Sequence, residues 1–175
     1  CDVLEAKKAT IACADYPGPV FLRLGRAPVP TITKQSDPYR IGEAVVMRAG
    51  DDVALVACGV MVAHAIRAAD QLAKEGIEAR VINLHTVKPL DQGTLLAAAK
   101  ETGAVVTAEE HTVLGGLGGA VAECLGQAHP VPMRFVGVLD RFGTSGDPAD
   151  LMKAFRLMPE DIAGAARDVL RLKQR

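Results

Sequence analysis

Residues 53–58, VALVAC, are a continuous apolar run followed by a glycine at position 59. An apolar run of this length, without alternating polar residues, is typical of a strand that is buried on both faces of a parallel sheet. Apolar side chains then recur at helical spacing from Val62 to Ala73, and Gly76 stands where a left-handed C-terminal cap belongs. The stretch therefore predicts a buried strand followed by an amphipathic helix.

The same alternation continues along the chain. Further strands are expected at residues 79–84, 104–108 and 134–139. Helices are expected after Asp91, over residues 115–127, and at the two openings Asp147-Pro148 and Pro159-Glu160. Strands that alternate with helices pair in parallel through right-handed crossovers. From about residue 40 onward we therefore expect an α/β fold in three layers, α/β/α. Its open and mostly parallel sheet would have about four parallel strands plus one edge strand at residues 44–48.

The N-terminal residues predict a different arrangement. Residues 2–14 are expected to form a helix with Asp2 as N-cap and Glu5 three positions later, and Pro17-Gly18-Pro19 ends it. A short strand is expected at residues 20–24, before a proline-containing, extended stretch typical of a linker. We divide the chain into residues 1–34, the last helix and strand of one domain with a linker, and residues 35–175, an α/β domain. Because the sequence starts with Cys1, we expect a fragment of a longer chain.

The composition excludes several classes of protein. Twenty Lys and Arg against 21 Asp and Glu give a net charge of -1, so the basic surface that nucleic-acid binding requires is absent. The longest uncharged run in the first half, residues 53–66, is shorter than the roughly 18 apolar residues of a membrane-spanning helix. Neither nucleic acid nor a membrane is therefore expected as a partner. The four cysteines are widely spaced and form no CxxC, which favours reduced thiols in a cytoplasmic protein.

Glu109, Glu110 and His111 follow an expected strand at its carboxyl end, where open α/β sheets bind their ligands. Two adjacent carboxylates and an imidazole could perform acid-base chemistry. No nucleophile and no metal-ligand spacing accompany them, so no metal site is expected. An interface or a capping cluster is therefore the second interpretation of these three residues.

The glycine run at residues 115–119, GGLGG, opens the helix after that strand. Free backbone N–H groups at a helix N-terminus can bind an anion, so Gly115 and Gly116 are candidates for a site that takes an effector. The other interpretation is close approach to a neighbour, which glycine permits because it has no Cβ. The chain contains no P-loop, and no GxGxxG follows the first strand, so a dinucleotide site is not expected.

Arg26 ends the expected strand at residues 20–24 and introduces the proline-containing loop. This position leaves a planar, bidentate hydrogen-bond donor exposed beside a domain boundary, where a phosphorylated substrate could use it. A solvated surface arginine is the alternative.

Four blocks of sequence together resemble the C-terminal part of transketolase, in particular the C-terminal half of the split or archaeal-type enzymes. They are residues 19–26 (PVFLRLGR), 81–91 (VINLHTVKPLD), 108–118 (AEEHTVLGGLG) and 140–146 (DRFGTSG). The blocks occur in the family's order and spacing, and the resemblance covers nearly the whole chain. Deoxyxylulose phosphate synthases and the β chains of 2-oxo acid dehydrogenases share this C-terminal fold and are the competing families.

The resemblance implies transfer of two-carbon ketol units between sugar phosphates, a reaction of the pentose phosphate pathway and carbohydrate metabolism. Thiamine diphosphate and Mg²⁺ would be bound by preceding domains, and residues 1–34 would be a remnant of the pyrimidine-binding domain. The fragment alone is then expected to bind no cofactor, to carry no catalytic residue and to be inactive. Its partners would be the N-terminal domains or subunit of the same enzyme and a second copy in a homodimer.

Two positions have a specific meaning in this comparison. Arg26 matches the arginine that holds the substrate's terminal phosphate in the family. Arg156 departs from the family, which usually has Gly before the leucine at this point, and the departure bears on how the local helix ends. A dimerisation or regulatory module, using the edge from Glu109 to Gly119, is the alternative function.

Overall fold

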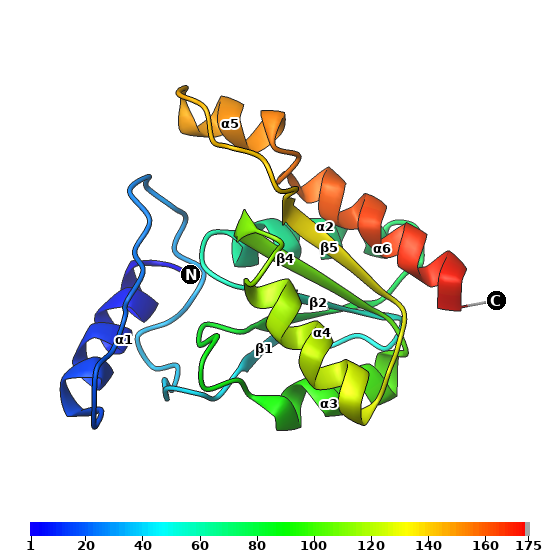
Figure 1. The fold of residues 1–175 in the computed structure, drawn as a ribbon. Coiled ribbons are helices and arrows are strands. Elements are labelled where there is room, and N and C mark those ends of the chain that lie inside the picture. The colour runs from blue at the N-terminus through cyan, green and yellow to red at the C-terminus, as the bar shows by residue number, and fades with distance from the viewer. Residues whose placement is uncertain (174–175) are drawn as a thin grey trace.

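A five-stranded sheet runs through the middle of the molecule, and the computed structural model describes residues 1–173. Its elements in chain order are α1 (Val3–Asp15), β1 (Val45–Arg48), β2 (Val53–Ala57), α2 (Met61–Ala73), β3 (Ala79–Asn83), α3 (Gln92–Thr102), β4 (Val105–Thr112), α4 (Leu117–Ala128), β5 (Met133–Val138), α5 (Pro148–Ala154) and α6 (Pro159–Lys173). Figure 1 shows the sheet between two layers of helices, with α1 beyond one end of the strands and α5 projecting from the body.

The strands are ordered β1-β3-β2-β4-β5. β2, β3, β4 and β5 are parallel, and β1 is an antiparallel edge strand on β3. All five residues of β2 are fully buried, because this strand lies in the centre with helices over both faces. The expected α/β/α class is confirmed, and so are the parallel strands and the edge strand at residues 44–48.

The two faces of the sheet have separate apolar cores. α2 and α6 cover one face, where their side chains pack on Leu55, Val81 and Val106. α3 and α4 cover the other, where they pack on Val56 and Ile82. Most buried positions of α2 are alanines, so this helix lies close to the sheet. The alternating pattern of buried side chains in β3 and β4 thus separates the two cores.

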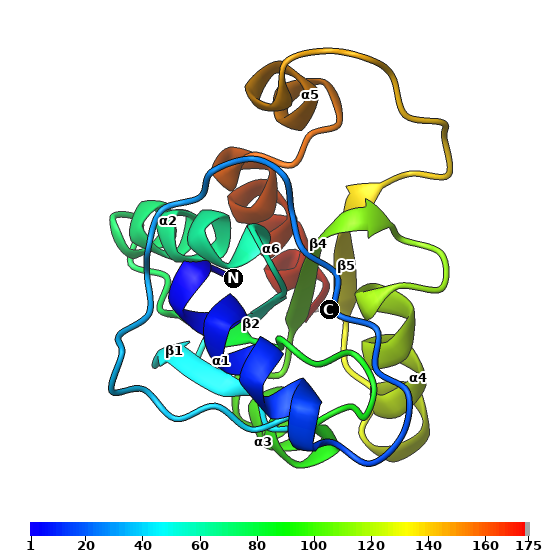
Figure 2. The ribbon, with the colours of Figure 1, turned by 90° about the vertical axis from the view of Figure 1, so that its left-hand side faces the viewer.

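The N-terminal segment lies beyond the carboxyl ends of the parallel strands. α1 begins at the predicted N-cap: the Asp2 side chain accepts a hydrogen bond from the Glu5 N–H at 2.9 Å. Only Glu5 and Ala9 of α1 are buried. In Figure 2, where α1 faces the viewer, the chain after it runs as a long open loop before it reaches β1.

The prediction of a strand at residues 20–24 is wrong, because residues 16–44 contain neither a helix nor a strand. The sequence VFLRL has strand-forming side chains, but a strand needs a partner for its backbone groups. This stretch finds none within residues 1–173, and the side chain of Phe21 is 89% exposed.

Candidate functional site

Glu109 closes the end of β4 against the start of α4. Its side chain is buried, and its two carboxylate oxygens accept hydrogen bonds from the backbone N–H groups of Leu117 at 2.7 Å and Gly118 at 2.8 Å. The N-cap residue of α4 is Gly116, which has no side chain to supply these bonds. A carboxylate at a helix N-terminus is also favoured by the helix dipole. Glu109 therefore occupies the place where an external anion would meet α4.

Two glycines allow this close approach. A Cβ on Gly116 would overlap the Glu109 carboxylate, and a Cβ on Gly118 would lie 2.6 Å from Phe135 Cδ1 and 2.9 Å from Thr107 Oγ1. Gly115 has a φ of 71°, a left-handed conformation that favours glycine. This geometry favours the close-approach interpretation of the glycine run. An effector site at Gly115 and Gly116 stays a prediction.

Glu110 and His111 do not join Glu109 in one acid-base group. β4 continues to Thr112, so successive side chains alternate: Glu109 points inward, whereas the Glu110 side chain is exposed. His111 Nδ1 lies 2.8 Å from the carbonyl oxygen of Thr112 and 3.9 Å from Glu109 Oε2. The structure thus separates the two carboxylates that the sequence places side by side, and only His111 stays near Glu109.

The loop that carries Arg26 crosses the carboxyl edge of the sheet. Arg23 Nη2 donates a hydrogen bond to the carbonyl oxygen of Glu110 at 3.3 Å, at the end of β4. A Cβ on Gly25 would lie 3.8 Å from Val60 Cγ1, just before α2. Arg26 itself is exposed. The predicted phosphate ligand therefore lies on the edge where ligands bind in open α/β sheets, although the loop is not a strand.

A buried polar cluster at the end of β3 was not predicted from the sequence. Glu5 Oε1 accepts a hydrogen bond from Asn83 Nδ2 at 2.5 Å, although a capping box would have directed Glu5 back to its own helix. His85 stacks on Tyr39 with the ring centres 4.3 Å apart. Burial lowers the pKa of His85, while the negative charge of Glu5 opposes this shift. The cluster joins α1 to the sheet, and the spacing of Glu5 and Asn83 in sequence gave no signal of it.

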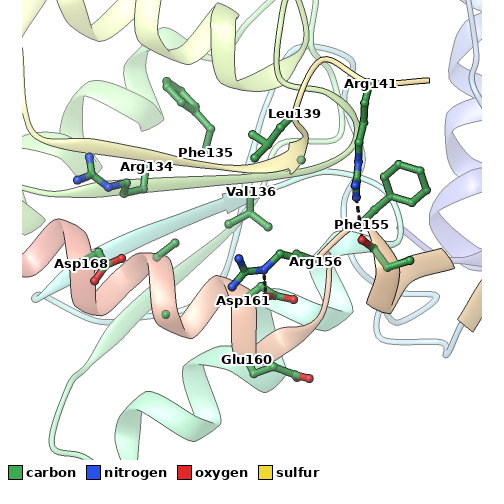
Figure 3. Close-up of a pocket in the computed structure, with 14 residues that line it drawn as sticks. Arg134, Phe135, Val136, Leu139, Arg141, Phe155, Arg156, Glu160, Asp161 and Asp168 are labelled. Carbon is green, nitrogen blue, oxygen red and sulfur yellow. Dashed lines mark hydrogen bonds and ion pairs between the residues drawn. The ribbon is translucent and has the colours of Figure 1, made fainter. Parts of the chain in front are cut away.

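A groove of about 430 Å³ separates β5 from α6 and was also not predicted (Figure 3). We call it the β5–α6 groove. Its apolar lining includes Val136 of β5, Phe155 after α5, and Gly164 and Ala165 of α6. Six charged residues surround it: Arg134, Arg141, Arg156, Glu160, Asp161 and Asp168.

Two further surveys cover the described residues. Among residues 1–173 no group of three or more His, Cys, Asp or Glu side chains is arranged to hold a metal ion. No helix in that part of the chain combines the length and apolarity needed to cross a membrane.

Residues 42–162 match the family described as the C-terminal domain of transketolase. The chain is 48% identical over 158 residues to the 6-deoxy-6-sulfo-D-fructose transketolase subunit SqwH of Clostridium sp. (strain MSTE9), covering 90% of this chain and 49% of that protein. It is 36% identical over 172 residues to one of the subunits of the apulose-4-phosphate transketolase of Phocaeicola vulgatus, covering 98% and 55%.

A solved structure is similar over almost the whole chain. It is described as a split-gene transketolase, inactive beta4 tetramer, and matches with a TM-score of 0.96 at 42% identity. The match covers 99% of this chain and 57% of that one. The chain thus spans about half the length of the curated relatives it matches.

Proposed function

The chain belongs to the transketolase family as its C-terminal domain, and we propose that it forms the C-terminal part of one of the two kinds of subunit of a split transketolase. The observation that carries this proposal is the similarity to the split-gene enzyme over 99% of the chain, at 42% identity and a TM-score of 0.96. The two curated relatives, both described as transketolase subunits, support it.

The proposed reaction is transfer of a two-carbon ketol unit between sugars that carry a terminal anionic group. The names of both relatives support this substrate class, since one is named for a sulfo-sugar and the other for a sugar phosphate. Arg26 is the proposed ligand of that anion, because guanidinium binds phosphate and sulfonate oxygens through two parallel N–H donors. The proposal thus concerns the terminal anion that these sugars share.

The described residues do not themselves fit thiamine diphosphate with Mg²⁺. A diphosphate at the α4 N-terminus would have to displace Glu109, whose carboxylate already binds the free N–H groups. No metal-holding group of side chains lies within residues 1–173. We therefore assign the cofactor, which supplies the electron sink for ketol transfer, to other parts of the complete enzyme.

The proposed partners are the chain that carries the rest of the active site and further copies of this chain. One relative is named as a single subunit of a larger enzyme, which supports the first contact, and the beta4 assembly of another supports the second. We place the protein in the cytoplasm, because all four of its cysteines are free.

The test is the Arg26→Ala substitution in the complete, reconstituted enzyme. Loss of one charge-assisted bidentate contact is worth roughly 1.5 to 3 kcal/mol, so KM for phosphorylated substrates should rise about 10- to 150-fold. KM for unphosphorylated analogues should change little. Arg40→Ala, which removes only an exposed pair with Glu43, is the matched control. An equal loss with both substrate types would refute the role of Arg26.

A further inference from the structure

The segment between β5 and α6 projects from the body of the molecule. We call residues 139–154, which include α5, the arm. No residue of α5 is buried, and the apolar side chains of Leu139 and Phe142 are 68% and 97% exposed. Figure 1 shows α5 standing away from both helical layers. Large apolar side chains with this exposure indicate an interaction surface.

The arm is held in this position at its base. Arg141 Nη2 donates a hydrogen bond to the carbonyl oxygen of Ala154 at 2.7 Å, and its guanidinium lies 4.2 Å from the centre of the Phe155 ring (Figure 3). Asp140 and Arg156, which flank the arm, have φ angles of 44° and 58°. Such left-handed residues without a glycine are strained, and they persist only where the surroundings fix them. The contacts therefore hold the arm open and keep it from folding back onto the groove.

The β5–α6 groove lies next to the base of the arm. β5 pairs with β4 on one side only, and no other strand of residues 1–173 covers its outer edge. The groove has an apolar lining that includes Val136, and Phe135 on the same strand is 41% exposed. A free strand edge beside an apolar groove is a surface to which another chain can add.

We propose that the arm and the β5–α6 groove form an interface between two copies of this chain, with Phe142 of each copy seated in the groove of the other. An interface with twofold symmetry must be complementary to itself. The groove meets this requirement, because its rim carries three arginines and three acidic residues. The relative at 42% identity is described as a beta4 tetramer, which favours a second copy as the occupant. The inference rests on the self-association included in the proposed function.

The first experiment uses tryptophan as a reporter in the full chain. These 175 residues contain no Trp, so Phe142→Trp introduces one emitter whose wavelength reports burial. Its emission should shift to shorter wavelength as protein concentration rises. Val46→Trp on the opposite edge strand β1, where Val46 is half-exposed, is the control and should not shift. Unchanged emission of Phe142→Trp at every concentration overturns the proposal. So does a shift that occurs only when the partner subunit is added.

The second experiment measures self-association by sedimentation. Phe142→Asp should raise the dissociation constant about 30-fold, as loss of an interface hot spot does, whereas Val46→Asp should leave it unchanged. Phe142 has almost no contacts in its own chain, so circular dichroism should show that the variant stays folded. Equal dissociation constants for Phe142→Asp and the wild type, or a wild type that is monomeric throughout, contradict the proposal. The Arg26 assay of ketol transfer reports separately on the proposed function.

Discussion

At the scale of single residues, Gly118 and Gly119 are neighbours with opposite requirements. A Cβ on Gly118 would meet Phe135, Thr107 and Glu109, whereas a Cβ on Gly119 would meet nothing within 4 Å. Gly118→Ala should therefore destabilise the protein by about 1 to 3 kcal/mol through overpacking. Gly119→Ala should stabilise it by about 0.5 to 1 kcal/mol, because alanine favours the helix.

Urea unfolding followed by circular dichroism measures both changes. The pair provides its own control, since both substitutions add one methyl group to the first turn of α4. If the two variants had equal stability, close approach would not explain the glycine run.

The sequence identified the residues at this edge but not their directions. Glu109, Glu110 and His111 could be singled out because they follow an apolar strand. The expected strand ended at position 108, since EEHT has no apolar pattern, and the alternation inside the longer β4 was therefore missed. Which carboxylate turns inward depends on the N-terminus of α4, a tertiary contact that spacing along the chain does not encode.

At the scale of the elements, the end of α5 shows what the substitution of a family glycine costs. Arg156 has a φ of 58°, and the next residue, Leu157, donates its N–H to the Met152 carbonyl at 2.9 Å. This bonding is the left-handed termination at which glycine is preferred. The arginine thus holds a conformation that the family's glycine would adopt without strain.

Arg156→Gly should accordingly stabilise the protein by about 0.5 to 1 kcal/mol, after the added flexibility of the unfolded chain is subtracted. The melting temperature should rise by roughly 2 to 4 °C, as thermal unfolding can measure. Arg156→Ala is the control: it removes the exposed contact with Asp161 but keeps the strain, so it should give no gain. A glycine variant no more stable than the alanine variant would contradict this explanation.

The elements themselves were largely predictable, and the exception has a physical cause. Strands with buried neighbours, such as β2 and β3, show their position through apolar runs, and helices show theirs through caps such as Asp91. Residues 20–24 have the same local preference as a strand, but no strand lies beside them among residues 1–173. Propensity describes what a segment can form, whereas pairing decides what it does form.

At the scale of the whole molecule, Asp2 joins α1 to the loop that follows it. Its carboxylate accepts hydrogen bonds from the N–H of Glu5, from the N–H of Ile32 at 2.7 Å, and from both the N–H and the hydroxyl of Thr33. Burial raises the pKa of Asp2, but these hydrogen bonds together outweigh it and lower the pKa from 3.8 to about 2. The folded state thus favours the ionised carboxylate.

The pH dependence of stability follows from this shift. Because the folded pKa lies below the unfolded one, the stabilisation is complete above pH 4 and is lost as the pH falls toward 2. Asp2→Asn should be less stable than the wild type at neutral pH, and the difference should shrink between pH 4 and pH 2. Urea unfolding across this range measures it, with Asp15→Asn at the exposed end of α1 as the control. A constant difference at every pH would contradict the role of ionised Asp2.

The β5–α6 groove could not be predicted from the sequence, because it exists only where two elements meet. Arg134 and Asp168 are far apart in the chain, and each alone resembles an ordinary surface residue. The cluster of Glu5 and Asn83 has the same origin, since it joins residues at separations where spacing carries no signal.

The position of α6 in the chain has a consequence for biosynthesis. α6 covers one face of the sheet with Ile162, Ala163, Ala166 and Val169, yet it follows every strand that it covers. A ribosome that has completed β5 still needs a few seconds, at roughly 5 to 20 residues per second, to produce α6. During that interval the nascent chain presents the uncovered side of β2 and β4 to its surroundings. Chaperones that bind apolar segments would meet the unfinished domain at this face.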